Sequence, residues 1–147
     1  MPEVVELPPQ TVVGVRGEVD ENTLGEFFGR AVTEASARIP ADAIAGPVTE
    51  VVHYDDGTHF DVTIGFLVST VPGVPGLEVV HLPAGPTLRE VHQGDYPGLT
   101  AAYERLTEAL KDRGRTRELS WEIYTSGPAD NPDPSTWRTE VYVPLSS

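Results

Sequence analysis

Two short segments near the C-terminus each carry a glutamate two positions before a tyrosine: Glu122 with Tyr124, and Glu140 with Tyr142. Carboxylates act as general acids, general bases and charge partners for cations, and tyrosine adds an aromatic ring with a hydroxyl group. If the segments are paired strands, the alternation of side chains predicts that all four groups share one face of the sheet. Val141 and the other alternate residues would then form an apolar layer beneath the helices. The alternative interpretation is a solvated sheet face that binds no ligand, because glutamate and tyrosine are common on such faces.

The strands that would position these groups belong to an expected internal repeat. The sequence of residues 3–8 (EVVELP) recurs at 78–83 as EVVHLP, 75 residues later. The same spacing relates Leu24 to Leu99, and each of these residues opens a stretch with helical periodicity. A segment rich in proline and glycine, residues 71–76, lies between the two copies. We therefore expect a duplicated unit.

Hydrophobic periodicity predicts the order strand, strand, helix, strand, strand in both copies. The expected elements are strands at 3–7 and 11–19, a helix at 24–39 capped by Asn22 or Thr23, and strands at 48–54 and 60–68, then strands at 77–82 and 87–92, a helix at 97–114, and strands at 119–125 and 137–143. This order predicts an α+β domain over residues 1–147, built from pseudo-symmetric ββαββ halves at 1–70 and 77–147. We expect an antiparallel sheet with two main helices on one face and a ligand groove on the other.

The first half lacks the acidic and aromatic pattern of the second. In the strand at 60–68, alternate residues are apolar, whereas the other set includes Thr63 and Gly65. When the ends of the two final strands are matched, Thr63 corresponds to Glu140 and Gly65 to Tyr142. One half then supplies acidic and aromatic groups while the other leaves space, as an off-centre pocket requires.

Composition excludes several classes of function. The chain has 147 residues, 10 Lys and Arg against 23 Asp and Glu, a net charge of −13, and no cysteine. The negative charge repels phosphate backbones and anionic headgroups, so neither nucleic-acid nor membrane partners are expected. Residues 55–61 fit a hairpin turn better than a metal loop, and we expect no metal and no cofactor. No signal-peptide pattern is present, and we expect a cytoplasmic location.

Residues 91–99 (VHQGDYPGL) precede the second predicted helix, and the strands 121–124 and 139–145 flank a loop rich in proline and aspartate. With Gly-x-Tyr before the helix and Glu-x-Tyr-x-Pro at the end, the whole chain resembles the GyrI-like small-molecule-binding domain. The resemblance implies a duplicated fold with a ligand groove on the sheet. That family includes effector domains of multidrug-responsive transcription activators, in which a buried glutamate and aromatic residues receive lipophilic cations.

The resemblance also implies which residues bind the ligand. Either Glu140 or Glu122 takes the role of the glutamate, and the choice between them is open. Tyr96 lies either at the groove mouth or at the helix start. The full set of implied ligand-binding residues is Glu140, Glu122, Tyr124, Tyr142, Trp121, Tyr54 and Tyr96.

The leading functional hypothesis is a stand-alone domain that binds lipophilic, cationic or electrophilic aromatic small molecules, for drug or toxin sequestration or sensing. One alternative is a hydrolase that opens cyclopropane-bearing or related toxins, with Glu140 or Glu122 as general base and Tyr142 as proton donor. Burial should raise the pKa of that glutamate unless a cation offsets the effect. Another alternative is an acidic protein-interaction module that acts on a topoisomerase. Because the first strand begins near Glu3, we expect no direct binding of nucleic acid.

Overall fold

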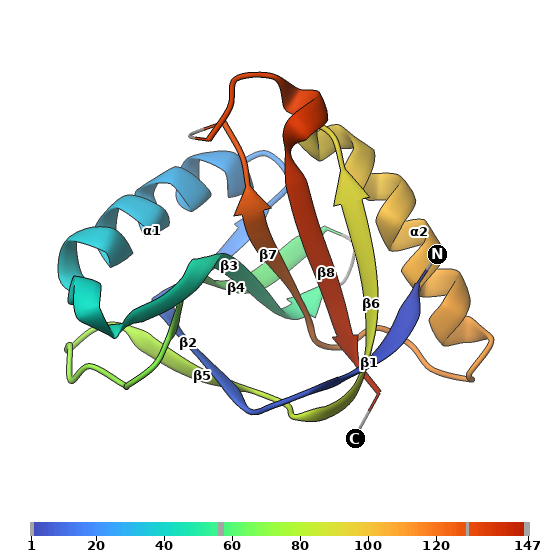
Figure 1. Ribbon diagram of the computed structural model, residues 1–147, viewed down its shortest axis with the longest axis horizontal. Coiled ribbons are helices and arrows are strands. Elements are labelled where there is room, and N and C mark those ends of the chain that lie inside the picture. Colours follow the sequence, from blue (N-terminus) through green and yellow to red (C-terminus); the bar gives the residue numbers. More distant parts are fainter. Residues whose placement is uncertain (1, 56–57, 129, 146–147) are drawn as a thin grey trace. The chain divides into compact units, whose positions relative to one another are not determined.

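The computed structural model describes residues 2–55, 58–128 and 130–145, without the side chains of residues 54 and 55 (Figure 1). Its elements are β1 (Glu3–Leu7), β2 (Gln10–Asp20), α1 (Leu24–Arg38), η1 (Ala41–Ala43), β3 (Ile44–Asp55), β4 (His59–Val68), β5 (Glu78–Leu82), β6 (Gly85–Gln93), η2 (Tyr96–Gly98), α2 (Leu99–Lys111), β7 (Ser120–Ser126), η3 (Pro134–Thr136) and β8 (Arg138–Pro144). The strand pairs described below are antiparallel, which confirms the α+β class with two main helices. The expected hairpin turn includes residues 56 and 57, which lie outside the described residues.

The chain divides into two compact units, Pro9–Pro83 and the combination of Met1–Pro8 with Ala84–Ser147. We call them the first unit and the second unit. The first unit has the strand order β3-β4-β2-β5 and the second has β1-β6-β8-β7. In each unit the edge strand comes from the other sequence repeat, because β1 pairs with β6 and β5 pairs with β2. The strands on either side of Pro8-Pro9 are therefore not partners, because β1 pairs with β6 while β2 pairs with β4 and β5.

In the first unit, α1 packs on one face of the sheet. Its apolar stripe contributes Phe27, Ala31 and Ala35, all buried. The stripe meets the apolar layer of β4, including Val62 and Ile64, in agreement with the alternation predicted for this strand. Directly before the helix, the Asp20 carboxylate accepts hydrogen bonds from the amides of Asn22 and Thr23, and Thr23 is the N-cap but makes no capping hydrogen bond with its side chain. Helical and strand periodicity therefore positioned these elements correctly.

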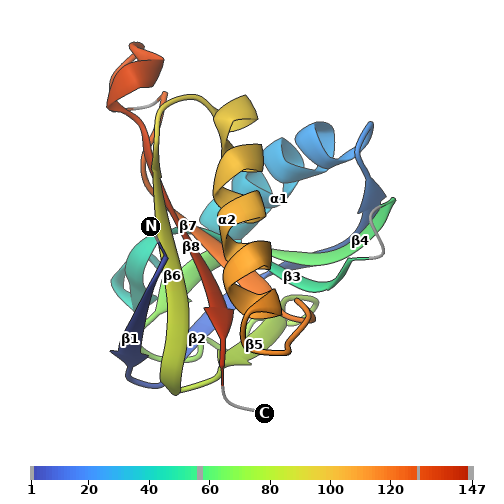
Figure 2. The same ribbon diagram turned by 90° about the vertical axis from the view of Figure 1, so that its right-hand side faces the viewer.

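In the second unit, α2 packs against β6 and β8 (Figure 2). Leu106 and Leu110 of the helix are buried against Leu88, Val141 and Val143. We call the sheet face that carries Val141 the helix-side face and the opposite one the far face. No helix in the described ranges is long and apolar enough to cross a lipid bilayer.

The two units place different residues at corresponding positions of their strand pairs. Gly14 lies opposite Gly65 in the first unit, whereas Arg89 lies opposite Tyr142 in the second. A Cβ atom on Gly65 would collide with the backbone carbonyl of Val13, so the two strands have room for glycine alone there. The match of Gly65 with Tyr142 stays a prediction, because the registers of the two pairs do not test the duplication.

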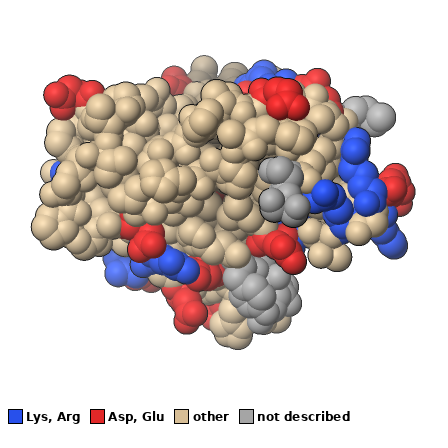
Figure 3. Space-filling view, turned by 90° about the horizontal axis from the view of Figure 1, so that it is seen from below, with Lys and Arg blue, Asp and Glu red and all other residues tan. Residues whose placement is uncertain are grey.

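Some of the charged side chains lie in contact with a side chain of opposite charge. On the face shown in Figure 3, acidic and basic side chains lie beside each other in several places. In the first unit, for example, the Arg16 guanidinium donates to both carboxylate oxygens of Asp61, at 2.9 and 2.6 Å. The net charge of −13 therefore coexists with local ion pairs.

Candidate functional site

The register of β7 and β8 separates the two Glu-x-Tyr pairs. Glu122 lies opposite Val141, and Glu140 lies opposite Ile123. Directly opposed residues of an antiparallel pair point to the same face. Glu122 therefore lies on the helix-side face and Glu140 on the far face, so the prediction that all four groups share one face is wrong. From Trp121 to Tyr124 each even-numbered residue faces an odd-numbered one, which places Glu122 and Glu140 on opposite faces.

On the far face, the Glu140 carboxylate is held by two neighbours. Tyr142 Oη donates to Glu140 Oε1 at 2.7 Å, and Arg138 Nη2 donates to Oε2 at 3.0 Å. Burial acts to raise the pKa of Glu140, but the hydrogen bonds from Tyr142 and Arg138 outweigh it and lower the pKa. Glu140 therefore falls under the stated exception to a raised pKa, because Arg138 is a cation in contact with it and Tyr142 donates to it as well.

An aromatic pair lies beside this carboxylate. The ring of Trp121 stacks on that of Tyr142, with centroids 5.7 Å apart and an interplanar angle of 14°. Trp121 is fully buried and Tyr142 is nearly so. Burial and the hydrogen bond to Glu140 raise the pKa of Tyr142 to about 12. Arg89, opposite Tyr142, forms an ion pair with Glu3. The far face thus carries a packed aromatic layer with balanced charges.

The helix-side face carries the second group of predicted residues. Glu122 is only 5% exposed. In the part of the chain that the structure describes, its carboxylate has no ion pair and accepts no hydrogen bond. Tyr124, two residues further along β7, meets the ring of Tyr96 edge to face at 5.8 Å. A nearly buried carboxylate therefore lies on one face with an aromatic group.

Tyr96 connects this face to the loop between β7 and β8. It belongs to η2, directly before α2, and is 39% exposed. Its ring also lies 5.1 Å from that of Trp137, at an interplanar angle of 32°. Burial raises the pKa of Tyr96, and the negative charges of Asp130 and Glu122 raise it further. Tyr96 thus contacts the predicted Tyr124 and also Trp137, which the sequence reasoning did not identify.

Tyr54 is the last of the predicted ligand-binding residues, and two histidines have structural contacts. Tyr54 lies on β3 of the first unit, opposite Asp61, and its side chain is outside the described residues. His92 places Nε2 2.6 Å from the backbone oxygen of Asp95, next to η2, so it has a structural contact at the helix start. His53 is 2.8 Å from Thr63 Oγ1 in the first unit.

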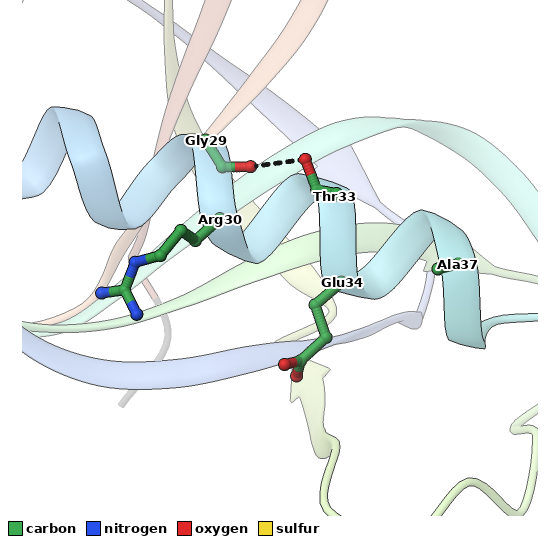
Figure 4. Close-up of a pocket in the computed structure, with 5 residues that line it drawn as sticks. All are labelled: Gly29, Arg30, Thr33, Glu34 and Ala37. Atoms are coloured by element: carbon green, nitrogen blue, oxygen red, sulfur yellow. Dashed lines mark hydrogen bonds between the residues drawn. The ribbon is translucent and has the colours of Figure 1, made fainter.

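A hollow of about 500 Å³ lies along α1 in the first unit, and none of the predicted site residues line it. Figure 4 shows its lining residues, all exposed and all from this one helix, with Thr33 Oγ1 donating to the Gly29 carbonyl. The hollow is an open surface on the helix side that faces away from Phe27 and Ala31. It offers no buried group to recognise a ligand.

Comparison with known proteins relates the whole chain to solved structures. The C-terminal domain of EcmrR has a TM-score of 0.80 and 19% identity, covering 100% of this chain and 98% of that one. SAV2435 bound to tetraphenylphosphonium has a TM-score of 0.74 and 12% identity, with coverages of 100% and 94%. A hydrolase from Listeria innocua has a TM-score of 0.57 and 15% identity, with coverages of 99% and 91%.

At these identities the structural similarities establish the fold alone. No curated protein sequence matches the chain. The family model described as the GyrI-like small molecule binding domain matches residues 1–146. The chain therefore belongs to the GyrI-like family of small-molecule-binding domains.

Proposed function

We propose that this protein binds lipophilic aromatic cations and that Glu122 is the carboxylate that pairs with their charge. The observation that supports this most is the burial of Glu122 without a cationic partner in the described residues. Burying a carboxylate without a partner is unfavourable, because the group loses its hydration and gains nothing in return. A cationic ligand supplies the missing partner. Tyr124 and Tyr96 offer aromatic surface on the same side.

Glu140 is less suited to the role of charge partner. Its carboxylate already accepts hydrogen bonds from Arg138 and Tyr142. A cation that approached Glu140 would be repelled by the Arg138 guanidinium, which already donates to Glu140 Oε2. Within this proposal, Glu140 and Tyr142 hold the far face together, and the binding surface lies on the helix side of β7. This location differs from the groove expected on the side away from the helices.

The proposal treats the two sequence halves as diverged copies of one unit. In support, Gly14 lies opposite Gly65 in the first unit, whereas the larger Arg89 and Tyr142 lie opposite each other in the second. SAV2435, a structural neighbour, was solved with the aromatic cation tetraphenylphosphonium. The same chemistry in this chain would place a cation against Glu122.

Hydrolysis is the weaker alternative, although two structural neighbours from Listeria innocua are described as hydrolases. A general base works best when its pKa lies near the working pH. The pKa of Glu140 is lowered, and its two oxygens are held by donors, so Glu140 is a poor base. Binding without chemical change is therefore the function we favour.

Calorimetric titration with two ions of the same shape tests the proposal. Tetraphenylphosphonium is the cation, and tetraphenylborate is the matched anion. We expect the cation to bind at least about tenfold more tightly, because a carboxylate attracts one ion and repels the other. Glu122→Gln should remove most of this preference. Glu140→Gln, the matched variant on the far face, should have a smaller effect.

Equal affinity for the two ions, or the absence of cation binding at millimolar concentration, would contradict the proposal. Loss of the preference in Glu140→Gln but not in Glu122→Gln would instead assign the charge to the far face.

A further inference from the structure

Trp137 lies between the β7–β8 loop and β8, and its ring is close to that of Tyr96. From this placement we infer that Trp137 is a specificity-determining residue, whose indole ring forms a cation–π wall for quaternary aryl or alkyl cations. The inference rests on the proposed function, since Glu122 supplies the charge on the same side. It adds a ligand-contacting residue from a different segment of the chain.

Three aromatic rings from separate segments form one cluster. Tyr96 comes from η2, Tyr124 from β7 and Trp137 from the residue just before β8. Tyr96 lies between the other two, with its ring centroid 5.8 Å from Tyr124 and 5.1 Å from Trp137. The cluster reaches the surface, because Tyr96 is 39% exposed and Trp137 is partly exposed. A ligand at the surface can therefore reach aromatic rings without entering the core.

The indole of Trp137 is fixed by its own hydrogen bonds. Its Nε1–H donates to the backbone oxygen of Asn131 at 2.7 Å, and its backbone oxygen accepts from the Gly94 amide at 2.9 Å. The loop is held as well, since the Gly127 amide donates to Asp130 Oδ2 at 2.9 Å. With its only polar atom satisfied, the indole has no remaining donor, and its ring face is its recognition surface. A ring fixed in advance loses little entropy when a ligand binds.

The electrostatics of the cluster favour positive charge. The negative charges of both Asp130 and Glu122 act on Tyr96. The face of an indole ring carries a negative quadrupole and attracts cations more strongly than a phenyl or phenol ring does. Arg138, the residue after Trp137, is engaged with Glu140 on the far face. The aromatic rings and the two carboxylates therefore all attract a cationic ligand.

Substitution of Trp137 separates this role from the charge of Glu122. We expect Trp137→Leu to weaken tetraphenylphosphonium binding by about 5- to 30-fold, and Trp137→Phe to weaken it less, in the order of cation–π strength. Tyr103→Leu is the matched control, because it removes a ring from α2 outside the cluster. The Tyr103→Leu variant should bind tetraphenylphosphonium with the affinity of the wild type. Unfolding curves of each variant show whether the fold is kept.

Tryptophan fluorescence provides a second measurement, which reports contact with the ligand even if a substitution does not change the affinity. The chain has two tryptophans, so Trp121→Phe leaves Trp137 as the only one and Trp137→Phe leaves Trp121. Saturation with tetraphenylphosphonium should change the emission of Trp137 and leave that of Trp121 nearly constant. This difference reports which ring the ligand contacts.

The outcomes distinguish the two proposals. If the wild type does not bind the cation, the proposed function fails. If Glu122→Gln weakens binding while Trp137→Leu binds like the wild type and the emission of Trp137 does not change, only the inference about Trp137 is overturned. A signal confined to Trp121 would place the ligand on the far face and overturn both.

Discussion

Tyr142 donates a 2.7 Å hydrogen bond to Glu140, two residues earlier in the same strand, while its ring stacks on Trp121. Removal of the hydroxyl in Tyr142→Phe keeps the stacked ring and loses the bond to a charged acceptor. We expect a loss of about 1–3 kcal/mol in the free energy of unfolding, measured by urea denaturation. Binding of tetraphenylphosphonium should change little, since the bond lies on the far face. A large loss of affinity with unchanged stability would contradict this assignment.

Stability should decrease in acid through Glu90 and Glu140. Burial opposes ionisation of Glu90, but the 2.8 Å hydrogen bond and the charge of Arg105, added to smaller contributions such as the Val91 amide, together lower the pKa of Glu90 from 4.5. A carboxyl with a lowered pKa in the folded state stabilises the fold above its unfolded pKa, and this contribution is lost as the pH falls through the folded value. We therefore expect the free energy of unfolding to decrease below about pH 4.5.

Glu90→Gln tests this pH dependence. The variant should be less stable than the wild type at pH 7 by about 1–3 kcal/mol, because Arg105 loses a charged acceptor that lies beneath α2. The difference should shrink as the pH falls below 4.5 and through the lowered pKa of Glu90, because Glu90 then becomes protonated in the wild type. An unchanged difference from pH 7 to pH 3 would show that the charge of Glu90 is not its cause.

A methyl group at Gly65 should destabilise the first unit. In Gly65→Ala the new Cβ would collide with the Val13 carbonyl, a backbone atom that cannot move without separating the strands. We expect a loss of at least about 2 kcal/mol in the free energy of unfolding. Gly29→Ala is the matched control, because no atom lies within 4 Å of its added Cβ on α1. It should stabilise the protein by about 0.5–1 kcal/mol, because alanine favours the helix.

Incubation with cyclopropane-bearing alkylators distinguishes binding from hydrolysis. We expect mass spectrometry to recover the ligand without added water, because Glu140 has a lowered pKa and is held by donors. The hydrolase alternative would be supported if the ligand gains water and if Glu122→Gln or Glu140→Gln lowers the rate of this reaction by about 100-fold or more. A gain of water that neither variant slows would place the chemistry elsewhere.

Local pattern was sufficient to predict the elements. The alternation of β4 and the helical stripe of α1 each require one face to be apolar, and Ile64 and Ala31 meet in the core accordingly. Such periodicities are properties of a single segment, so the sequence alone determines them.

The sequence could have indicated that Arg138 pairs with Glu140. It lies two residues before Glu140 on the same strand face, and this spacing brings a cation to the carboxylate. The hydrogen bond from Tyr142, together with the hydrogen bond and the charge of Arg138, lowers the pKa of Glu140, whereas burial alone would raise it. Trp137 had a weaker signal, a lone tryptophan at the end of a loop rich in proline and aspartate.

Tertiary structure alone decided the face of Glu122 and the partner of β1. A shift of one residue between β7 and β8 would move Glu122 to the face of Glu140, and nothing within either strand specifies this shift. Pairing of β1 with β6 likewise depends on strands more than 75 residues apart. The sequence determined which residues alternate, and long-range hydrogen bonding determined which of them meet, because register is a property of two strands together.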